Sequence, residues 1–199
     1  MFTLTAVSTF SETIRKSRFQ AVAGPVSDEA EAKAFIAHHS QLDANHNCWA
    51  WRVGQVYRFN DDGEPGGTAG KPILQAIDGQ GIDRVAVVVT RWFGGILLGS
   101  GGLIRAYGGT AAQCLRAAEK APVIAMGTLE IECDFSSLAA LKARVSAVPH
   151  AVIEIETFTE TGADITARVP SESIVHLQDT LISLMRGRGR VTSVRAYSI

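Results

Sequence analysis

The sequence predicts an α+β protein, an α/β sandwich of two successive domains, on three observations. The first is VAVVVT at residues 85–90, an unbroken and largely β-branched run typical of a strand buried on both faces. The second is that 13 of the 19 glycines fall between Asp61 and Thr110. The third is the order β-α-β-β-α-β after about residue 122, a ferredoxin-like arrangement. We therefore expect domains at residues 1–122 and 123–199.

The elements of the first domain follow from periodicity and from caps. Ser27-Asp28-Glu29 caps a helix, and Pro72 is tolerated in the first turn of the next one. CWAWRVG and QVYRFND alternate as a hairpin. The expected elements are a strand at 19–26, a helix at 29–42, a hairpin at 48–61, a helix at 68–77, the strand at 85–90 and a helix at 103–120.

The second domain shows alternating strands and two amphipathic helices. Ser136-Ser137 is the expected cap of its first helix, and Thr161-Gly162 is the expected turn between its central strands. The expected elements are a strand at 127–135, a helix at 138–148, strands at 151–160 and 163–170, a helix at 171–185 and a strand at 190–199.

Composition excludes several classes of protein. The net charge of −1 gives no global basic field, although it allows a local basic patch, and no DNA-specific motif is present. Cys48, Cys114 and Cys133 are far apart and odd in number, which suits a reducing compartment. The start of the chain lacks the pattern of a signal peptide, and no apolar run of about 18 residues suggests a membrane span. We expect a cytoplasmic protein.

The stretch TRWFGGILLGSGGLIRAYGG, at residues 90–109, places glycines between a strand and a helix. Exposed N–H groups and the helix dipole favour an anion at such a helix start, here Gly99 to Gly102. A dinucleotide fingerprint fails, because Ile104 stands where its third glycine belongs. A P-loop fails at Pro65 and Pro72.

These glycines have two interpretations. They can serve tight turns and close packing, with aromatic side chains filling the space that they leave. Alternatively they expose backbone to a ligand. Arg91 and Arg105 flank the run, Lys71 and Arg52 lie in neighbouring segments, and guanidinium groups suit phosphate. Trp92, Phe93 and Tyr107 could then stack on bases or on the side chains of a partner.

The charged clusters also have alternative interpretations. Asp61, Asp62 and Glu64 suit acid–base chemistry or a divalent cation, but Asp62-Gly63 is a turn dipeptide and favours a solvated turn. No spacing of His and Cys residues matches a metal site, so we expect neither metal nor cofactor. The run RGRGR supplies candidate RNA contacts, or cations that complement a helix dipole, at Arg186, Arg188 and Arg190.

Three blocks together carry a family resemblance: NHNCWAWR (45–52), DDGEPGGTAGKPIL (61–74) and VVVTRWFGGILLGSGGLIRAYGG (87–109). They resemble the YigZ/IMPACT family over most of residues 15–120. The resemblance implies a bacterial two-domain member. Its IMPACT N-terminal domain would be similar to domain 2 of ribosomal protein S5, and its C-terminal domain similar to the C-terminal domains of elongation factor G.

The resemblance also implies a role. Eukaryotic IMPACT modulates translation by competing for the activator of a starvation-responsive initiation-factor kinase, so regulation of translation is the expected setting. Asn47 stands where a second histidine is common, and Gly66 replaces a usual serine, which excludes a serine nucleophile there. The matching positions are His46, Arg52, Asp61, Asp62, Glu64, Thr68, Lys71, Arg91, Gly94, Gly95, Gly99, Gly101, Gly102 and Arg105.

Three functional hypotheses follow. The first is a non-enzymatic binding protein that contacts RNA, the ribosome or a translation-associated protein through the glycine-rich, arginine-flanked surface. The second is an enzyme that acts on a phosphorylated or nucleotide substrate, with the glycine-rich loop as its phosphate site. The third is a protein-interaction module without nucleic acid.

Overall fold

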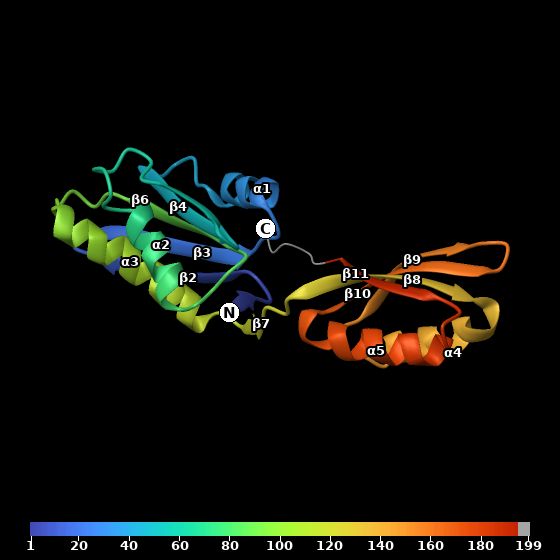
Figure 1. Ribbon diagram of the computed structural model, residues 1–199. Coiled ribbons are helices and arrows are strands. Elements are labelled where there is room, and N and C mark those ends of the chain that lie inside the picture. Colours follow the sequence, from blue (N-terminus) through green and yellow to red (C-terminus); the bar gives the residue numbers. More distant parts are fainter. Residues whose placement is uncertain (195–199) are drawn as a thin grey trace. The chain divides into compact units, whose positions relative to one another are not determined.

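The computed structural model describes residues 1–194 and divides into two compact units (Figure 1). The first unit is Met1–Val123, and the second runs from Ile124 onward. This division lies one residue beyond the expected boundary. Residues 195–199, part of the last expected strand, lie outside the described residues. In the part of the chain that is described, no helix is long and apolar enough to cross a membrane.

The first unit is built on a five-stranded antiparallel sheet with the strand order β2-β3-β6-β4-β5. The helices α2 and α3 cover one face, and α1 covers the other (Figure 1). The central position of β6 explains its unbroken apolar run, because both of its faces are covered. The strands are β2 (Ser8–Ile14), β3 (Ser17–Pro25), β4 (His46–Val53), β5 (Val56–Asn60) and β6 (Val85–Trp92); the helices are α1 (Glu29–His39), α2 (Gly70–Gly79) and α3 (Ser100–Ala117).

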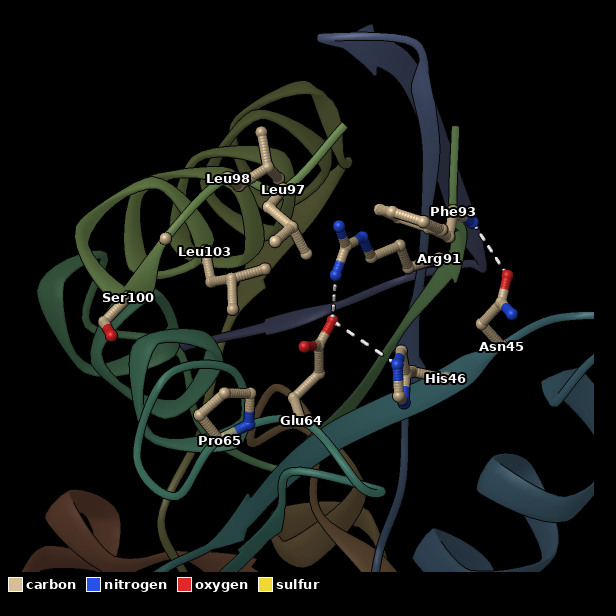
Figure 2. A pocket seen from close by; sticks show the side chains of 11 residues that line it. Asn45, His46, Glu64, Pro65, Arg91, Phe93, Leu97, Leu98, Ser100 and Leu103 are labelled. Atoms are coloured by element: carbon tan, nitrogen blue, oxygen red, sulfur yellow. Dashed lines mark hydrogen bonds and ion pairs between the residues drawn. The ribbon is translucent and has the colours of Figure 1, made fainter. Parts of the chain in front are cut away.

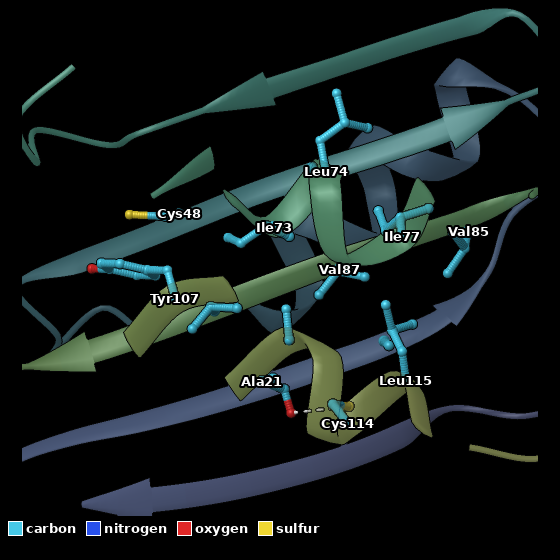
Figure 3. Close-up of a cluster of buried hydrophobic side chains, with 14 of the residues drawn as sticks. Ala21, Cys48, Ile73, Leu74, Ile77, Val85, Val87, Tyr107, Cys114 and Leu115 are labelled. Carbon is cyan, nitrogen blue, oxygen red and sulfur yellow. Dashed lines mark hydrogen bonds between the residues drawn. The ribbon is translucent and has the colours of Figure 1, made fainter. Parts of the chain in front are cut away.

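Alternate residues of β6 enter two separate cores. Val85 and Val87 pack in the larger core with Ile77 of α2 and Leu115 of α3, all fully buried (Figure 3). Ala86 faces the opposite side, in the core under α1. This period of two residues is the geometry of a strand, and it shows why residues 85–89 are all apolar.

Two strands near the amino terminus were not expected from the sequence. The short strand β1 (Phe2–Leu4) pairs with β7 (Lys120–Pro122), and the edge strand β2 pairs with β3. The sequence of β2, STFSETI, is mostly polar, so its alternation carries little hydrophobic signal. The strand β2 joins the sheet because it pairs with β3, and not because it has an apolar face of its own.

The second unit has the predicted order β-α-β-β-α-β. Its antiparallel sheet has the order β11-β8-β10-β9, and its core joins Leu129 and Ile131 of β8 to Leu141 of α4 and Leu181 of α5. Its elements are β8 (Met126–Asp134), α4 (Phe135–Ser146), β9 (Val152–Phe158), β10 (Gly162–Pro170), the 3₁₀ turn η1 (Ser171–Ser173), α5 (Ile174–Met185) and β11 (Arg190–Val194).

The expected cap of α4 was wrong. Asp134, rather than Ser136 or Ser137, is the N-cap, and its carboxylate accepts the backbone N–H of Ser137 at 2.8 Å. The helix therefore begins at Phe135, three residues before the expected start. Aspartate and serine are both good caps, so composition alone did not separate them.

Candidate functional site

A pocket of about 440 Å³ opens in the first unit, where the glycine-rich stretch meets the acidic turn (Figure 2). Its walls come from the start of β4, the turn before α2, the end of β6 and the start of α3. Antiparallel pairing of β4 with β6 places His46 opposite Arg91 at this end of the sheet. The lining residues are Asn45, His46, Glu64, Pro65, Arg91, Phe93, Leu97, Leu98, Gly99, Ser100 and Leu103.

A buried ion pair forms the floor of this pocket. Oε1 of Glu64 accepts hydrogen bonds from Nη1 of Arg91 at 2.6 Å and from the hydroxyl of Tyr107 at 2.8 Å. The side chains of Glu64 and Arg91 are only 4% and 6% exposed. Their charges therefore compensate each other out of contact with water, and Arg91 is not a free surface cation.

Tyr107 is not available to stack on a base or on a partner, which was one of the two interpretations of the aromatic residues. Its ring is fully buried and lies edge-on to Phe19, with the ring centroids 5.3 Å apart. Burial, together with the neighbouring Cys48 and Glu64, raises the pKa of the Tyr107 phenol. The hydroxyl thus stays protonated and serves as a donor to Glu64.

Arg91 retains one donor without an acceptor. Its Nη2 lies 3.5 Å from the hydroxyl oxygen of Ser17, and its guanidinium lies 5.4 Å from the ring centroid of Phe93. Among the residues that the structure describes, none accepts a hydrogen bond from Nε of Arg91. A buried donor in this condition is an exception in folded proteins.

The tautomer of His46 follows from its neighbours. Nδ1 lies 2.7 Å from the carbonyl oxygen of Asp62, so it must carry the proton and donate it. Nε2 lies 3.8 Å from Oε1 of Glu64. The neighbouring Asn47 has a structural role, because its side-chain oxygen accepts a hydrogen bond of 2.9 Å from the hydroxyl of Thr90.

The acidic turn organises the start of α2. The carboxylate of Asp61 accepts the backbone N–H groups of Gly67, Ala69 and Gly70 at 2.8–2.9 Å. Partial burial opposes ionisation, but these three bonds outweigh it and lower the pKa of Asp61. The buried Thr68 donates its hydroxyl to the carbonyl of Pro65. These contacts support the interpretation of the segment as a turn.

The remaining carboxylates of the turn are also engaged. The side chain of Asp62 accepts the backbone N–H of Asn47 at 2.6 Å, and Glu64 is held by Arg91 and Tyr107. Within residues 1–194, no three His, Cys, Asp or Glu side chains are grouped so that they could hold a metal ion.

The glycines divide between the two interpretations. Gly94 serves packing, because a Cβ there would overlap the backbone of Lys16, and its N–H donates to the hydroxyl of Ser17 at 3.1 Å. Gly95 and Gly99 have φ angles of +82° and +70°, and a Cβ on either would meet nothing within 4 Å. Their backbone lies in open space.

The helix α3 begins at Ser100, three residues before the expected start, so that Gly101 and Gly102 belong to its first turn. Its N-cap, Gly99, provides no side-chain hydrogen bond, and the first turn holds no acidic residue. Among the residues that the structure describes, no side chain caps the first N–H groups of the helix, which begins next to the pocket that Gly99 and Ser100 line. Arg105 is exposed, with its guanidinium near Gly101.

Other residues singled out in the sequence lie away from the pocket. Arg52 is near the far end of β4, where its Nε is 2.7 Å from a carboxylate oxygen of Asp78. Lys71 is exposed in the first turn of α2 and does not line the pocket. The candidate RNA contacts belong to the second unit: Arg186 is the C-cap of α5, Arg188 lies 3.6 Å from Asp134, and Arg190 begins β11.

Fold and pocket define a two-unit α+β protein with a candidate ligand site in its first unit. The model of the Impact N-terminal domain matches residues 15–115, just over half of the chain and all of the pocket. The chain belongs to the IMPACT family, as a bacterial YigZ-like member.

Curated relatives agree with this assignment, and a solved structure has a similar fold. The chain is 56% identical over 111 residues to the "IMPACT family member in pol 5′ region" of Thermus thermophilus, covering 56% of this chain and 62% of that protein. It is 40% identical over 144 residues to the "IMPACT family member YigZ" of Escherichia coli, covering 68% and 70%. A crystal structure of a protein described as hypothetical aligns with a TM-score of 0.73 and 32% identity over 98% of both chains.

Proposed function

We propose that this chain is a translation-linked regulatory binding protein whose first unit contacts RNA through a glycine-loop surface. This surface comprises residues 92–105 and the β2–β3 turn at residues 15–18. The observation that carries the proposal is the group of exposed cations around it, Arg15, Lys16, Arg18 and Arg105. They supply a local basic patch on a chain whose formal net charge is −1.

The β2–β3 turn presents two of these cations at an energetic cost. Arg15 and Lys16 form a two-residue hairpin turn between the paired residues Ile14 and Ser17, with φ angles of +43° and +68°. Asparagine and glycine are favoured in such turns, and other residues lose roughly 1–2 kcal/mol in this conformation. Side chains kept at such a cost are candidates for function.

The β2–β3 turn packs against the glycine-rich loop. The close approach of Gly94 to the backbone of Lys16 holds the two segments together. The guanidinium of Arg18 lies 3.6 Å from the ring centroid of Trp92, at the start of the loop. Within residues 1–194, the side chains of these four cations are in no ion pair, so they are available to phosphate groups.

The finer fold assignment is part of the same proposal. We assign the first unit to the fold of domain 2 of ribosomal protein S5, and the ferredoxin-like second unit to the fold of the C-terminal domains of elongation factor G. Both folds occur in proteins of the translation apparatus. The strand order β11-β8-β10-β9 with both helices on one face supports the second assignment. RNA, ribosomal subunits or a translation-associated protein are the corresponding partners.

The salt dependence of RNA binding tests the proposal. Fluorescence anisotropy with a labelled 12-nucleotide single-stranded RNA should give a dissociation constant that rises steeply with salt. The double variant Arg15→Gln/Arg105→Gln should bind more weakly, with a salt slope smaller by about 1.4, since each phosphate contact contributes about 0.7. Arg58→Gln, on the exposed strand β5 of the same unit, is the control.

An unchanged slope in the double variant would overturn the RNA interface. A pull-down from lysate, with and without ribonuclease, separates the alternatives. Loss of ribosomal components on ribonuclease treatment supports the proposal. A protein partner that is retained after the treatment, with no RNA binding by the purified chain, favours the interaction module instead.

A further inference from the structure

The pocket shares residues with the glycine-loop surface. It also combines three features that the basic patch of the proposed function does not use. These are the free amides at the start of α3, the unmatched donor of Arg91 and an exposed apolar wall. We propose that this pocket binds a nucleoside 5′-monophosphate unit, with its phosphate at α3 and its base against the apolar wall. The inference deepens the proposed function by naming the ligand of this site, and it rests on that function.

The start of α3 provides the place for the phosphate. This helix is 18 residues long, and its first turn has neither a capping side chain nor an acidic residue. The unpaired N–H groups and the positive end of the helix dipole favour an anion there. Ser100 adds a hydroxyl donor, and the guanidinium of Arg105, one turn further along α3, lies close to Gly101.

A second, independent observation is the unmatched donor on Arg91. This residue is 5% exposed, lines the pocket and has no acceptor for its Nε within residues 1–194. Figure 2 shows its side chain extending between Phe93 and Glu64 toward Leu97. A phosphomonoester has three terminal oxygens, so it can accept hydrogen bonds from the α3 amides, from the Ser100 hydroxyl and from Nε of Arg91 at the same time. Glu64 does not oppose it strongly, because Arg91 compensates its charge.

The apolar wall provides the place for the base. Phe93 is 44% exposed and Leu97 is 82% exposed, although both are large apolar side chains at the pocket. Aromatic side chains in such positions stack on bases with little sequence preference. The pocket volume of about 440 Å³ also lies within the roughly 300–1,000 Å³ typical of small-molecule sites.

Two RNA probes that differ only at the 5′ end test the inference. A 10-nucleotide RNA with a 5′-phosphate should bind at least about 10-fold more tightly than the same RNA with a 5′-hydroxyl. Ser100→Asp should remove this preference, because it places a negative charge in the first turn of α3, where it also stabilises the helix. Ser100→Asn, which removes the hydroxyl but adds no charge, should weaken the preference less than Ser100→Asp does.

Adenosine monophosphate, measured by calorimetry, distinguishes a free nucleotide from an RNA end. Binding of this nucleotide that is lost in Ser100→Asp supports the pocket even where neither RNA binds, in which case the proposed RNA function fails alone. Equal binding of both RNAs, together with no binding of the nucleotide, overturns the pocket while RNA binding stands. A preference for the 5′-phosphate that Ser100→Asp leaves intact also overturns it.

Discussion

At the scale of single residues, Glu64 joins segments that are far apart in the sequence. Its Oε1 accepts hydrogen bonds from Arg91 of β6 and from Tyr107 of α3. The same atom lies 3.8 Å from Nε2 of His46 of β4. A buried pair of this kind depends on both partners, because a single remaining charge has no water to solvate it. The network therefore connects the stability of the first unit to the shape of its pocket.

The first prediction concerns this pair. Arg91→Met should lower the free energy of unfolding by about 3–5 kcal/mol, because it leaves the Glu64 charge buried and uncompensated. The double variant Arg91→Met/Glu64→Gln should recover part of that loss. Urea denaturation measures both, and the exposed Arg58→Met should stay within about 0.5 kcal/mol of the parent protein. A double variant no more stable than Arg91→Met alone would contradict this account.

The second prediction separates a packing glycine from an open one. Gly94→Ala should destabilise the protein by about 1–3 kcal/mol or more, because its Cβ would overlap the backbone of Lys16. Gly66 is the matched control, since a Cβ there meets nothing within 4 Å and its φ is not positive. Gly66→Ala should change the free energy of unfolding by less than about 0.5 kcal/mol. Equal effects of the two substitutions would refute the packing role of Gly94.

The third prediction is a pH dependence at Cys48. Burial raises the pKa of its thiol to about 12, and nearby carboxylates add to this effect. In the unfolded chain a thiol ionises near pH 8.5. Between these values the folded state binds more protons, so the free energy of unfolding falls as pH rises, by up to about 1.4 kcal/mol per pH unit.

Urea denaturation at pH 9 and pH 10.5 measures this dependence. The decrease should be smaller in Cys48→Ala than in the parent protein. Tyr107, Cys114 and Cys133 also have raised pKa values and remain in both proteins, so the difference between the two isolates Cys48. Identical decreases would show that the Cys48 thiol does not contribute.

At the scale of elements, α3 contains glycines that differ in what surrounds them. A Cβ on Gly108 would lie 3.4 Å from Pro72 of α2, whereas a Cβ on Gly109 would meet nothing within 4 Å. Gly109→Ala should therefore stabilise the protein by about 0.5–1 kcal/mol through a less flexible unfolded chain. Thermal and urea denaturation show whether the variant is more or less stable than the parent protein. A loss of stability would indicate that Gly109 has a role outside the helix itself.

At the scale of the whole molecule, the two units have separate hydrophobic cores. Two clusters of buried hydrophobic residues lie within Met1–Val123, and a third lies in the unit that starts at Ile124. The strand β1, near the start of the first unit, pairs with β7, which ends at Pro122, one residue before the end of this unit. We expect fragments 1–123 and 124–199 each to unfold cooperatively when made separately, as circular dichroism during urea denaturation would show. A fragment that lacks a cooperative transition would show that its core is not sufficient.

The sequence by itself determined the order of most elements and the family. These properties depend on local patterns, such as VAVVVT in β6 and the alternating strands of the second unit, or on motifs read along the chain. Where the local pattern was weak, as in the polar strand β2, or ambiguous, as at the cap of α4, the sequence did not decide.

Only the tertiary structure decided which charged groups meet and which glycines remain open. Arg91 and Glu64 are 27 residues apart, and the strand order together with the path of the turn brings them into contact. His46 and Arg52 share β4, yet only His46 lines the pocket, because they lie near opposite ends of the strand. Such contacts arise from the packing of distant segments, which a motif does not record.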